Sequence, residues 1–387
     1  MKTLVWISRL LVGTIFILSG LVKANDPHGF SYKLQEYFDV FSKDLSTEVH
    51  YELTEEGKAL EGQACAHLIL ENHKEKIETE IPESEQGFFT KTFVSLFSWF
   101  GEKSLGLAIF ICVLEILLGL AVLYGFKVPL VSWLLLLMIL FFTFLTFYSA
   151  YFEKVTDCGC FGDALKLTPW QSFGKDVFLL VFILPIFFSR KRIQSQGAPD
   201  QSHAALMIAS VVLMALLCIL QFKWYFPILF IGLAHSVRWL SGLWFSKQTA
   251  TYTALITTVA SAVFSIWTAR TEPLKDYRPW AVGKNIRAEA ASSPDRVQTN
   301  LLYIRKSDCE VIAKDANGTD WSWMTEEFDQ THLFWKQENK VLEEGQQAKI
   351  KDISMFDPYT GTSMGDSLFA EQGYALLSVV NYLDEIK

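Results

Sequence analysis

Apolar residues form long uninterrupted runs along most of this chain. A helix that rises about 1.5 Å per residue needs roughly 20 apolar residues to cross a bilayer core about 30 Å thick. Seven runs meet this requirement, and they cover residues 4–22, 105–124, 128–150, 173–189, 204–222, 224–245 and 251–268. We therefore predict seven membrane-spanning helices. The sixth run contains His235 and Arg238, which leaves the number of spans after residue 200 open.

The composition agrees with a membrane protein and excludes several other classes. Of the 387 residues, 51% are hydrophobic and only 20% are charged, whereas soluble domains contain about 25% charged residues. The net charge is −8 and there is no long basic stretch, so nucleic acid is not an expected partner. Six cysteines are too few for a fold built on disulfides.

The positions of lysine and arginine predict the orientation of the spans, because cytoplasmic loops are enriched in these residues. The basic residues that flank the runs are Lys2, Lys127, residues 190–192 and Lys247. They fall on one side if the N-terminus is cytoplasmic, which places residues 23–104, 151–172 and 270–387 outside. The alternative, that the first run is a cleaved signal peptide, is disfavoured by its length and by Arg9 within it.

The hydrophilic segment between the first two spans contains three predicted helices. Apolar residues three and four apart predict an amphipathic helix at 29–41, either packed under a domain or lying on the lipid surface. A second helix is expected at 59–70, bearing Cys65. The third, at 88–100, has the aromatic character of an interfacial helix, with Trp99 at the depth of the headgroups.

Residues 270–387 differ in composition from the spans and predict a small α+β domain. Segments 300–306 and 374–383 have the pattern of strands, and Asn-Gly at 317–318 is a turn signal. The sequence of this region contains no Walker A loop, GxGxxG, HExxH or CxxC. A binding or docking module is therefore the expected role.

The candidate chemistry of the sequence lies in the loop between the third and fourth spans. Cys158 and Cys160 flank Gly159. Residues two apart come close enough for a disulfide if the backbone dihedral angles of the middle residue are free, as those of glycine are. Such a disulfide is strained and therefore easily exchanged. Asp157 and Asp163 would raise the thiol pKa values if they lie close, which disfavours fast attack by a thiolate. A static disulfide or plain turn remains an alternative. A metal site is not expected, because zinc normally takes four ligands.

Charged residues inside the spans are the second candidate feature. Glu115 lies near the middle of the second span, where a charge must be paired, protonated or turned to a polar cavity. We expect Arg9 to be its partner, in a structural ion pair or, alternatively, in a proton relay or quinone contact. Lys23 is expected to be an interfacial anchor. Arg238 is expected to reach the cytoplasmic face, and His235 to be a packed histidine.

The other four cysteines separate into two pairs. Cys112 and Cys218 lie in apolar spans and should be small buried hydrophobes. Cys65 and Cys309 are both predicted outside the membrane, where unpaired thiols are uncommon. They could bond to each other or exchange with the pair in the loop, and free thiols are a third possibility.

Several motifs together resemble the MauE branch of the DoxX-like membrane proteins. These are CGCFGD at 158–163, PWQSFGKD at 169–176, the first span with the helix after it at 9–38, Glu115 in the second span, and FTFLTFYSAYF at 142–152. The resemblance covers about residues 5–190 without 45–88. It implies a four-helix membrane core at 1–190. The outer insertion at about 45–88, the additional helices at 191–269 and the extracytoplasmic domain at 270–387 are expected from the sequence itself and depart from the family pattern, so they could redirect the function.

The resemblance also implies a function. Members of this branch are tied to the maturation of a disulfide-rich periplasmic protein, so Cys158 and Cys160 become the candidate redox pair. Asp163, Lys175 and Asp176 become the residues that frame it. The expected protein is an all-α bundle in the bacterial inner membrane that takes part in thiol–disulfide exchange of exported proteins. A quinone is the possible cofactor, and Glu115 the possible proton carrier.

A competing hypothesis is a non-catalytic scaffold of an envelope or export complex. In both hypotheses the chain lies in the lipid bilayer and meets its protein partners through residues 23–104 and 270–387. A transporter is a third class, but the sequence shows no repeated half with broken helices.

Overall fold

The computed structural model describes residues 2–82, 84–155, 161–193, 201–244, 249–278, 281, 283–285, 293–317 and 321–345. The chain divides into two compact units. Unit 1 comprises Met1–Val49 and Glu78–Tyr277, and unit 2 comprises His50–Ile77 and Arg278–Lys387. The insertion after the first span is therefore shared between the two units.

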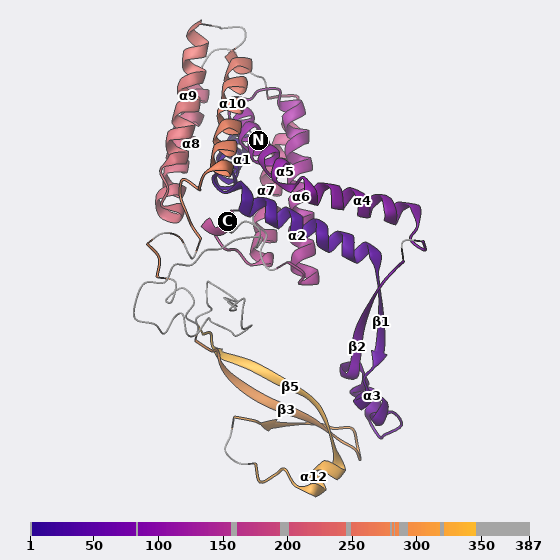
Figure 1. Cartoon of the computed structure of the whole chain (residues 1–387). Helices are drawn as coiled ribbons and strands as arrows, with labels where there is room; N and C mark the ends of the chain where they lie inside the picture. Colours follow the sequence, from indigo (N-terminus) through magenta and orange to yellow (C-terminus); the bar gives the residue numbers. More distant parts are fainter. Residues whose placement is uncertain are drawn as a thin grey trace, which may run out of the picture. The chain divides into compact units, whose positions relative to one another are not determined.

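Within the described part of unit 1, seven helices are long and apolar enough to cross a membrane. They are α1 (Lys2–Asn25), α5 (Ser104–Tyr124), α6 (Val128–Phe152), α7 (Pro169–Ser189), α8 (Gln201–Leu217), α9 (Phe226–Trp244) and α10 (Thr249–Arg270) (Figure 1). α8 continues in a π-helical turn, Cys218–Phe222. These helices confirm the seven predicted spans, whose apolar runs agree with them to within a few residues.

Helix α1 packs along α5, and glycines allow the two backbones to come close. A Cβ atom on Gly119 would lie 2.7 Å from the carbonyl oxygen of Gly13, and one on Gly20 would lie 2.9 Å from that of Cys112. The two helices therefore run antiparallel, with residues 13 and 20 of α1 opposite residues 119 and 112 of α5. Small residues at such contacts are typical of packed membrane helices.

We predict that Gly119→Ala destabilises the bundle by about 1–3 kcal/mol, because the new methyl group meets backbone that must move. The matched control is Gly106→Ala in the same helix, where a Cβ atom would meet nothing within 4 Å. The midpoint of thermal unfolding in detergent, followed by loss of helical circular dichroism, should fall for Gly119→Ala alone. Equal midpoints would contradict the close contact of α1 and α5.

Two further helices, α2 (Pro27–Ser46) and α4 (Phe88–Glu102), lie side by side and run across the spans (Figure 1). α2 buries one face, formed by Phe30, Leu34, Tyr37 and Phe38, and this face packs with α4 and α5. Of the two interpretations of residues 29–41, the packed helix is therefore the one observed. α4 leaves Phe88, Phe89 and Trp99 exposed, as a helix at the lipid interface would.

The predicted helix at 59–70 is wrong. Strands β1 (Thr47–Leu53) and β2 (Lys74–Glu80) form a two-stranded sheet, and between them α3 covers only Glu55–Leu60. Thr54 caps α3 by accepting the Gly57 N–H, which starts the helix earlier than expected. Glu61 has an extended backbone and ends the helix, and the φ values of +87° at Gly62 and +64° at Cys65 keep the following residues out of the helical region. Only short 3₁₀ turns follow, at Ala66–Leu68 and Leu70–His73.

The described part of the C-terminal region is a three-stranded antiparallel sheet in the order β4-β3-β5. Its elements are β3 (Arg296–Arg305), β4 (Val311–Asp315), α12 (Glu326–Thr331) and β5 (His332–Glu343). They confirm the small α+β domain and the strand predicted at 300–306, whereas the strand predicted at 374–383 lies outside the described residues.

The core of unit 2 joins the insertion to this sheet. Ile304 and Leu333 of the sheet pack against Cys65 and Ile69 of the insertion. Cys65 and Cys309 form a disulfide, with their Cα atoms 5.5 Å apart. Of the arrangements that the sequence left open for Cys65 and Cys309, the structure therefore has the disulfide between the two.

Candidate functional site

A buried ion pair joins α1 to α5. The Lys23 ammonium donates to Glu115 Oε1 over 2.5 Å, and the two side chains are only 2% and 3% exposed. The Lys23 nitrogen also lies 4.9 Å from the ring centre of Phe30 and 4.4 Å from that of Phe142. Two aromatic faces and one carboxylate therefore surround this ammonium, and each is attractive to a cation. The expectation that Lys23 is an interfacial anchor is wrong.

The expected pairing of Arg9 with Glu115 is also wrong, and the antiparallel register of α1 and α5 explains the error. Arg9 donates to the carbonyl oxygens of Val122 and Leu123, each over 2.9 Å. These positions lie about two turns along α5 from Glu115, or roughly 12 Å at 1.5 Å per residue. The end of α1, with Lys23, is the part of that helix that reaches Glu115.

A second ion pair lies in α7. Lys175 donates to Asp176 Oδ1 over 2.5 Å, and the Asp176 side chain is 1% exposed. The hydroxyl of Thr146 on α6 lies 3.1 Å from Asp176 Oδ2. Sequence reasoning singled out Lys175 and Asp176 but missed Thr146, because a threonine in an apolar span ordinarily bonds to its own helix, and this one also lies near Phe142 O.

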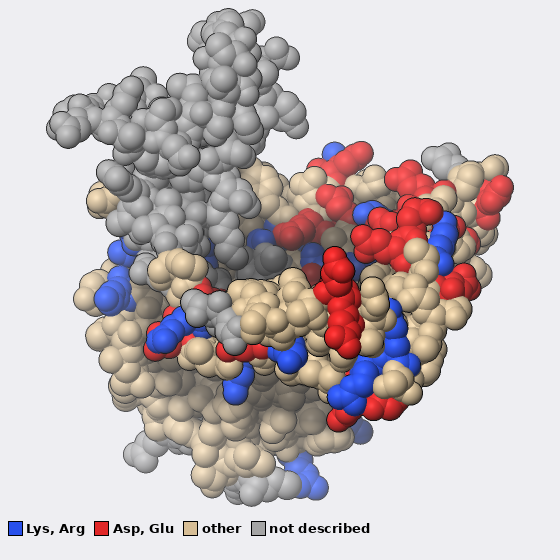
Figure 2. All heavy atoms as spheres, turned by 90° about the horizontal axis from the view of Figure 1, so that it is seen from below, with Lys and Arg blue, Asp and Glu red and all other residues tan. Residues whose placement is uncertain are grey.

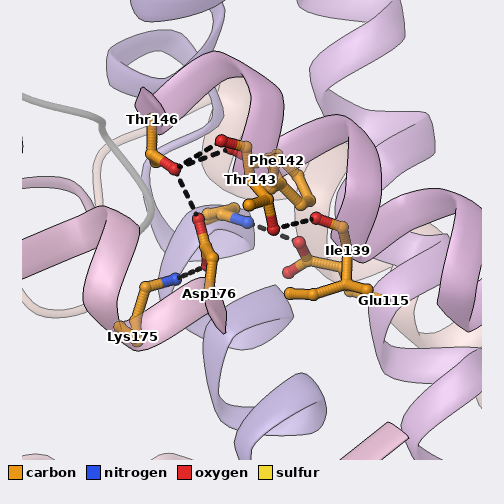
Figure 3. A network of polar contacts seen from close by, with 8 residues as sticks. Glu115, Ile139, Phe142, Thr143, Thr146, Lys175 and Asp176 are labelled. Atoms are coloured by element: carbon orange, nitrogen blue, oxygen red, sulfur yellow. Dashed lines mark hydrogen bonds and ion pairs between the residues drawn. The ribbon is translucent and has the colours of Figure 1, made fainter. Parts of the chain in front are cut away.

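The two ion pairs line one pocket among α1, α5, α6 and α7. Figure 3 shows the carboxylates of Glu115 and Asp176 close together inside the bundle, with Thr146 and Lys175 on the far side of Asp176. The pocket lining is Ile15, Phe16, Ser19, Lys23, Glu115, Ile139, Phe142, Phe161, Lys175, Asp176 and Leu179. The space open to the centre of a water molecule is about 20 Å³. Four charged side chains thus converge on a small cavity inside an apolar bundle.

The cysteines of the CGC motif lie just outside the described residues. Cys158 and Cys160, with Asp157, belong to the segment 156–160, and of Asp163 only the backbone is described, in the 3₁₀ turn Gly162–Ala164. Phe161 follows Cys160 directly in the chain, is buried, and forms part of the pocket wall. The residue that follows the CGC motif in the chain is therefore part of the wall of the charged pocket.

Both ends of this segment are fixed on the bundle. Val155 is buried, and its carbonyl oxygen accepts from the Ser149 hydroxyl over 2.5 Å. On the other side, the Phe161 ring packs 5.6 Å from the ring of Phe222, and the Lys175 nitrogen lies 5.5 Å from its centre. Lys175, a residue singled out from the sequence, therefore contacts the neighbour of Cys160.

Asp44 fastens α2 to the end of α6 just before the motif. Its carboxylate accepts from the Tyr148 hydroxyl and from the Lys154 ammonium. These bonds tie the crossing helix to the chain two residues before the segment 156–160.

A second polar cluster lies elsewhere in the bundle. His235 on α9 lies 2.9 Å from the Tyr124 hydroxyl on α5 and 2.9 Å from the Ser210 hydroxyl on α8, and Arg238 stacks 4.7 Å from the Tyr124 ring. This is the packed histidine predicted from the sequence. Cys112 and Cys218 are buried free thiols, as expected.

A bundle of seven apolar helices that encloses paired charges defines an integral membrane protein. Residues 86–189 match the family described as Methylamine utilisation protein MauE. The matched segment contains α4, α5, α6, the CGC motif and α7, so the chain carries a MauE domain and the predicted relationship is confirmed over these residues. Neither the curated proteins nor the solved structures contain a match to the chain.

Proposed function

We propose that this membrane protein takes part in thiol–disulfide exchange of exported proteins, with Cys158 and Cys160 as the exchanging pair. The observation that carries the proposal is the position of Phe161, which follows Cys160 in the chain and forms part of the wall of a pocket containing two ammonium groups and two carboxylates. Charged groups beside a thiol control its ionisation, and the thiolate is the reactive form.

The exchange balances between thiols alone. A thiolate of the exported protein attacks one sulfur of the Cys158–Cys160 disulfide, so that a mixed disulfide forms as the original bond breaks. A second thiolate of the same exported protein resolves the mixed disulfide. The exported protein is then oxidised by two electrons, and both cysteines of the motif are reduced.

The pocket does not fit the quinone that we expected from the sequence. Sites for small organic ligands usually enclose about 300–1,000 Å³, whereas the space beside Glu115 is about 20 Å³. We therefore derive no step through a quinone.

The proposal places the protein in a bacterial inner membrane with the N-terminus in the cytoplasm. Lys127, residues 190–192 and Lys247 then flank the spans on the cytoplasmic side, in agreement with the distribution of basic residues in known membrane proteins. The loop with Cys158 and Cys160 and the C-terminal region face the periplasm, where disulfides form.

We predict that Cys160→Ser accumulates mixed disulfides between Cys158 and exported proteins. Thiol–disulfide exchange is reversible, so the Cys158 thiolate can attack a disulfide of an exported protein, and without Cys160 no neighbouring thiol re-forms the Cys158–Cys160 bond and releases that protein. In the parent protein, mild reductant should make both cysteines available to alkylation, as measured by mass spectrometry of isolated membranes. Cys218→Ala, which removes a buried thiol elsewhere in the bundle, is the matched control and should trap nothing. Unchanged alkylation, together with no trapped partner, would contradict the proposal.

A scaffold for an envelope complex is the second candidate, and the charged surface of the molecule favours it. Figure 2 shows patches of Asp and Glu side chains with Lys and Arg between them. In unit 2, Glu55 and Glu71 are 90% and 80% exposed. The double variant Cys158→Ser/Cys160→Ser separates the two functions: a scaffold keeps its complex and its phenotype, whereas an exchange protein loses activity at normal abundance.

A further inference from the structure

We propose that the pocket beside Glu115 binds water, and that this water carries protons between Glu115 and the Lys175–Asp176 pair. The site would be a proton-exchange centre within the membrane. The proposal stands on the geometry of the pocket and does not require thiol exchange.

One carboxylate oxygen of Glu115 lacks a hydrogen-bond donor among the described residues. Glu115 Oε1 accepts from Lys23, but Oε2 is buried and has no hydrogen-bond partner among the described residues. Buried polar atoms are nearly always hydrogen-bonded to protein or to ordered water. An unpaired buried atom has lost its hydrogen bonds to solvent and gains none in the protein, so its burial costs free energy. A donor is therefore required beside Oε2, and the residue that bears this atom lines the pocket.

The cavity has the size and polarity that bound water requires. A water molecule needs about 10–15 Å³ of space for its centre and two to four polar partners. The cavity offers about 20 Å³ and is lined by Glu115, Ser19, Lys175 and Asp176 as well as by Lys23. One or two water molecules fit, and larger polar ligands do not.

Uptake of a proton by Glu115 changes the charge balance of the pocket. An incoming proton from the Asp176 side joins the water, and the water gives one of its own protons to Glu115 Oε2, so the water is regenerated. Glu115 becomes neutral while Lys23 stays charged. The rings of Phe30 and Phe142, 4.9 and 4.4 Å from the ammonium, continue to stabilise it by cation–π attraction. The aromatic faces thus make the protonated state of Glu115 tolerable.

The groups that face Glu115 come from a small number of elements. Among the described lining residues, α1 contributes Lys23 and α7 contributes Lys175 and Asp176, whereas α6 contributes the apolar Ile139 and Phe142. α2 and α10 also pack against α5, but none of the described lining residues comes from them. On α5 itself, Cys112 lies one turn from Glu115 and is buried.

Infrared spectroscopy of the full chain in lipid nanodiscs tests the proposal. Lowering the pH should produce a carboxylic-acid C=O band that shifts in D₂O within the mixing time and is absent from Glu115→Gln. Absence of a Glu115-dependent band at every pH at which the protein is folded would overturn the proposal, as would a band that does not exchange.

A cavity-filling variant makes the test specific to the water. Ile139→Phe should slow the deuterium exchange of Glu115 roughly tenfold or more, because a cavity below about one water sphere admits no water. Leu137→Phe is the control on the same helix, since Leu137 is 58% exposed on the outer face. Equal exchange rates in the two variants would overturn the proposal, and if Ile139→Phe does not fold, the exchange of the parent band decides.

The same measurement in Cys158→Ser/Cys160→Ser separates this proposal from the proposed function. The Glu115 band and its exchange should be unchanged there. If thiol trapping is lost and the Glu115 band stays normal, the proton-exchange site is supported independently of thiol exchange.

Discussion

Glu115→Leu should be the most damaging single substitution in the membrane bundle, with a loss of about 3–5 kcal/mol of unfolding free energy. Removal of one partner from a buried ion pair leaves the other charge buried without its oppositely charged partner, and the cation–π contacts of Lys23 with Phe30 and Phe142 offset only part of that loss. Lys23 is 2% exposed and cannot turn to water without leaving the pocket. The unfolding free energy, measured from the helical circular dichroism of the detergent-solubilised protein in a denaturant titration, tests this prediction.

The double variant Lys23→Met/Glu115→Leu should recover most of the loss, because two apolar side chains of similar volume replace the pair. Glu115→Gln should be milder than Glu115→Leu, since the amide oxygen still accepts from the Lys23 ammonium. Additive effects of Lys23→Met and Glu115→Leu would show that the two residues do not interact and would contradict the pair.

A partly exposed pair provides the matched control. Lys33 and Glu36 on α2 are joined over 2.9 Å, but their side chains are 26% and 37% exposed. Surface pairs of this kind contribute about 0–1 kcal/mol, so Glu36→Leu should leave the unfolding free energy nearly unchanged. A loss as large as that of Glu115→Leu would mean that burial is not the cause.

The seven spans could be predicted from the sequence because their signal is local. Each apolar run must be helical in a bilayer, where no water can satisfy the backbone. The strand at 300–306 could also be predicted because its signal, the residue pattern of the strand itself, is local. The helix expected at 59–70 is wrong because the Thr54 cap starts the helix at Glu55 and the extended backbone of Glu61 ends it at Leu60.

The candidate site could be predicted only in part. The apolar surroundings of Glu115 showed that it needed a partner, but the choice between Arg9 and Lys23 depends on the register of α1 against α5. That register is fixed by the contact of Gly13 with Gly119, which no local pattern specifies. The convergence of Asp176 with Glu115 on one pocket likewise requires the packing of α7 in the bundle.

Loss of the Cys65–Cys309 disulfide should unfold unit 2 while the membrane bundle remains intact. Among the described residues, the buried apolar cluster that holds the insertion to the sheet consists of Cys65, Ile69, Ile304 and Leu333, with Leu60, Cys309 and Trp335 packed partly buried against it. So small a core rarely suffices without a covalent link. The bond joins residues 244 positions apart. Removal of a native disulfide from a small secreted domain typically costs about 2–5 kcal/mol.

Cys65→Ala/Cys309→Ala in the full chain tests this prediction by limited proteolysis in detergent. Residues 50–77 should become susceptible to cleavage, whereas the thermal unfolding of the helices should remain that of the parent, because the ion pairs and glycine contacts of the bundle are unchanged. Cys218→Ala, which removes a sulfur from the bundle alone, should leave the protease resistance of unit 2 unaltered. Continued resistance in the double variant would mean that the sheet and its apolar contacts hold the insertion unaided, and that the bond has another role.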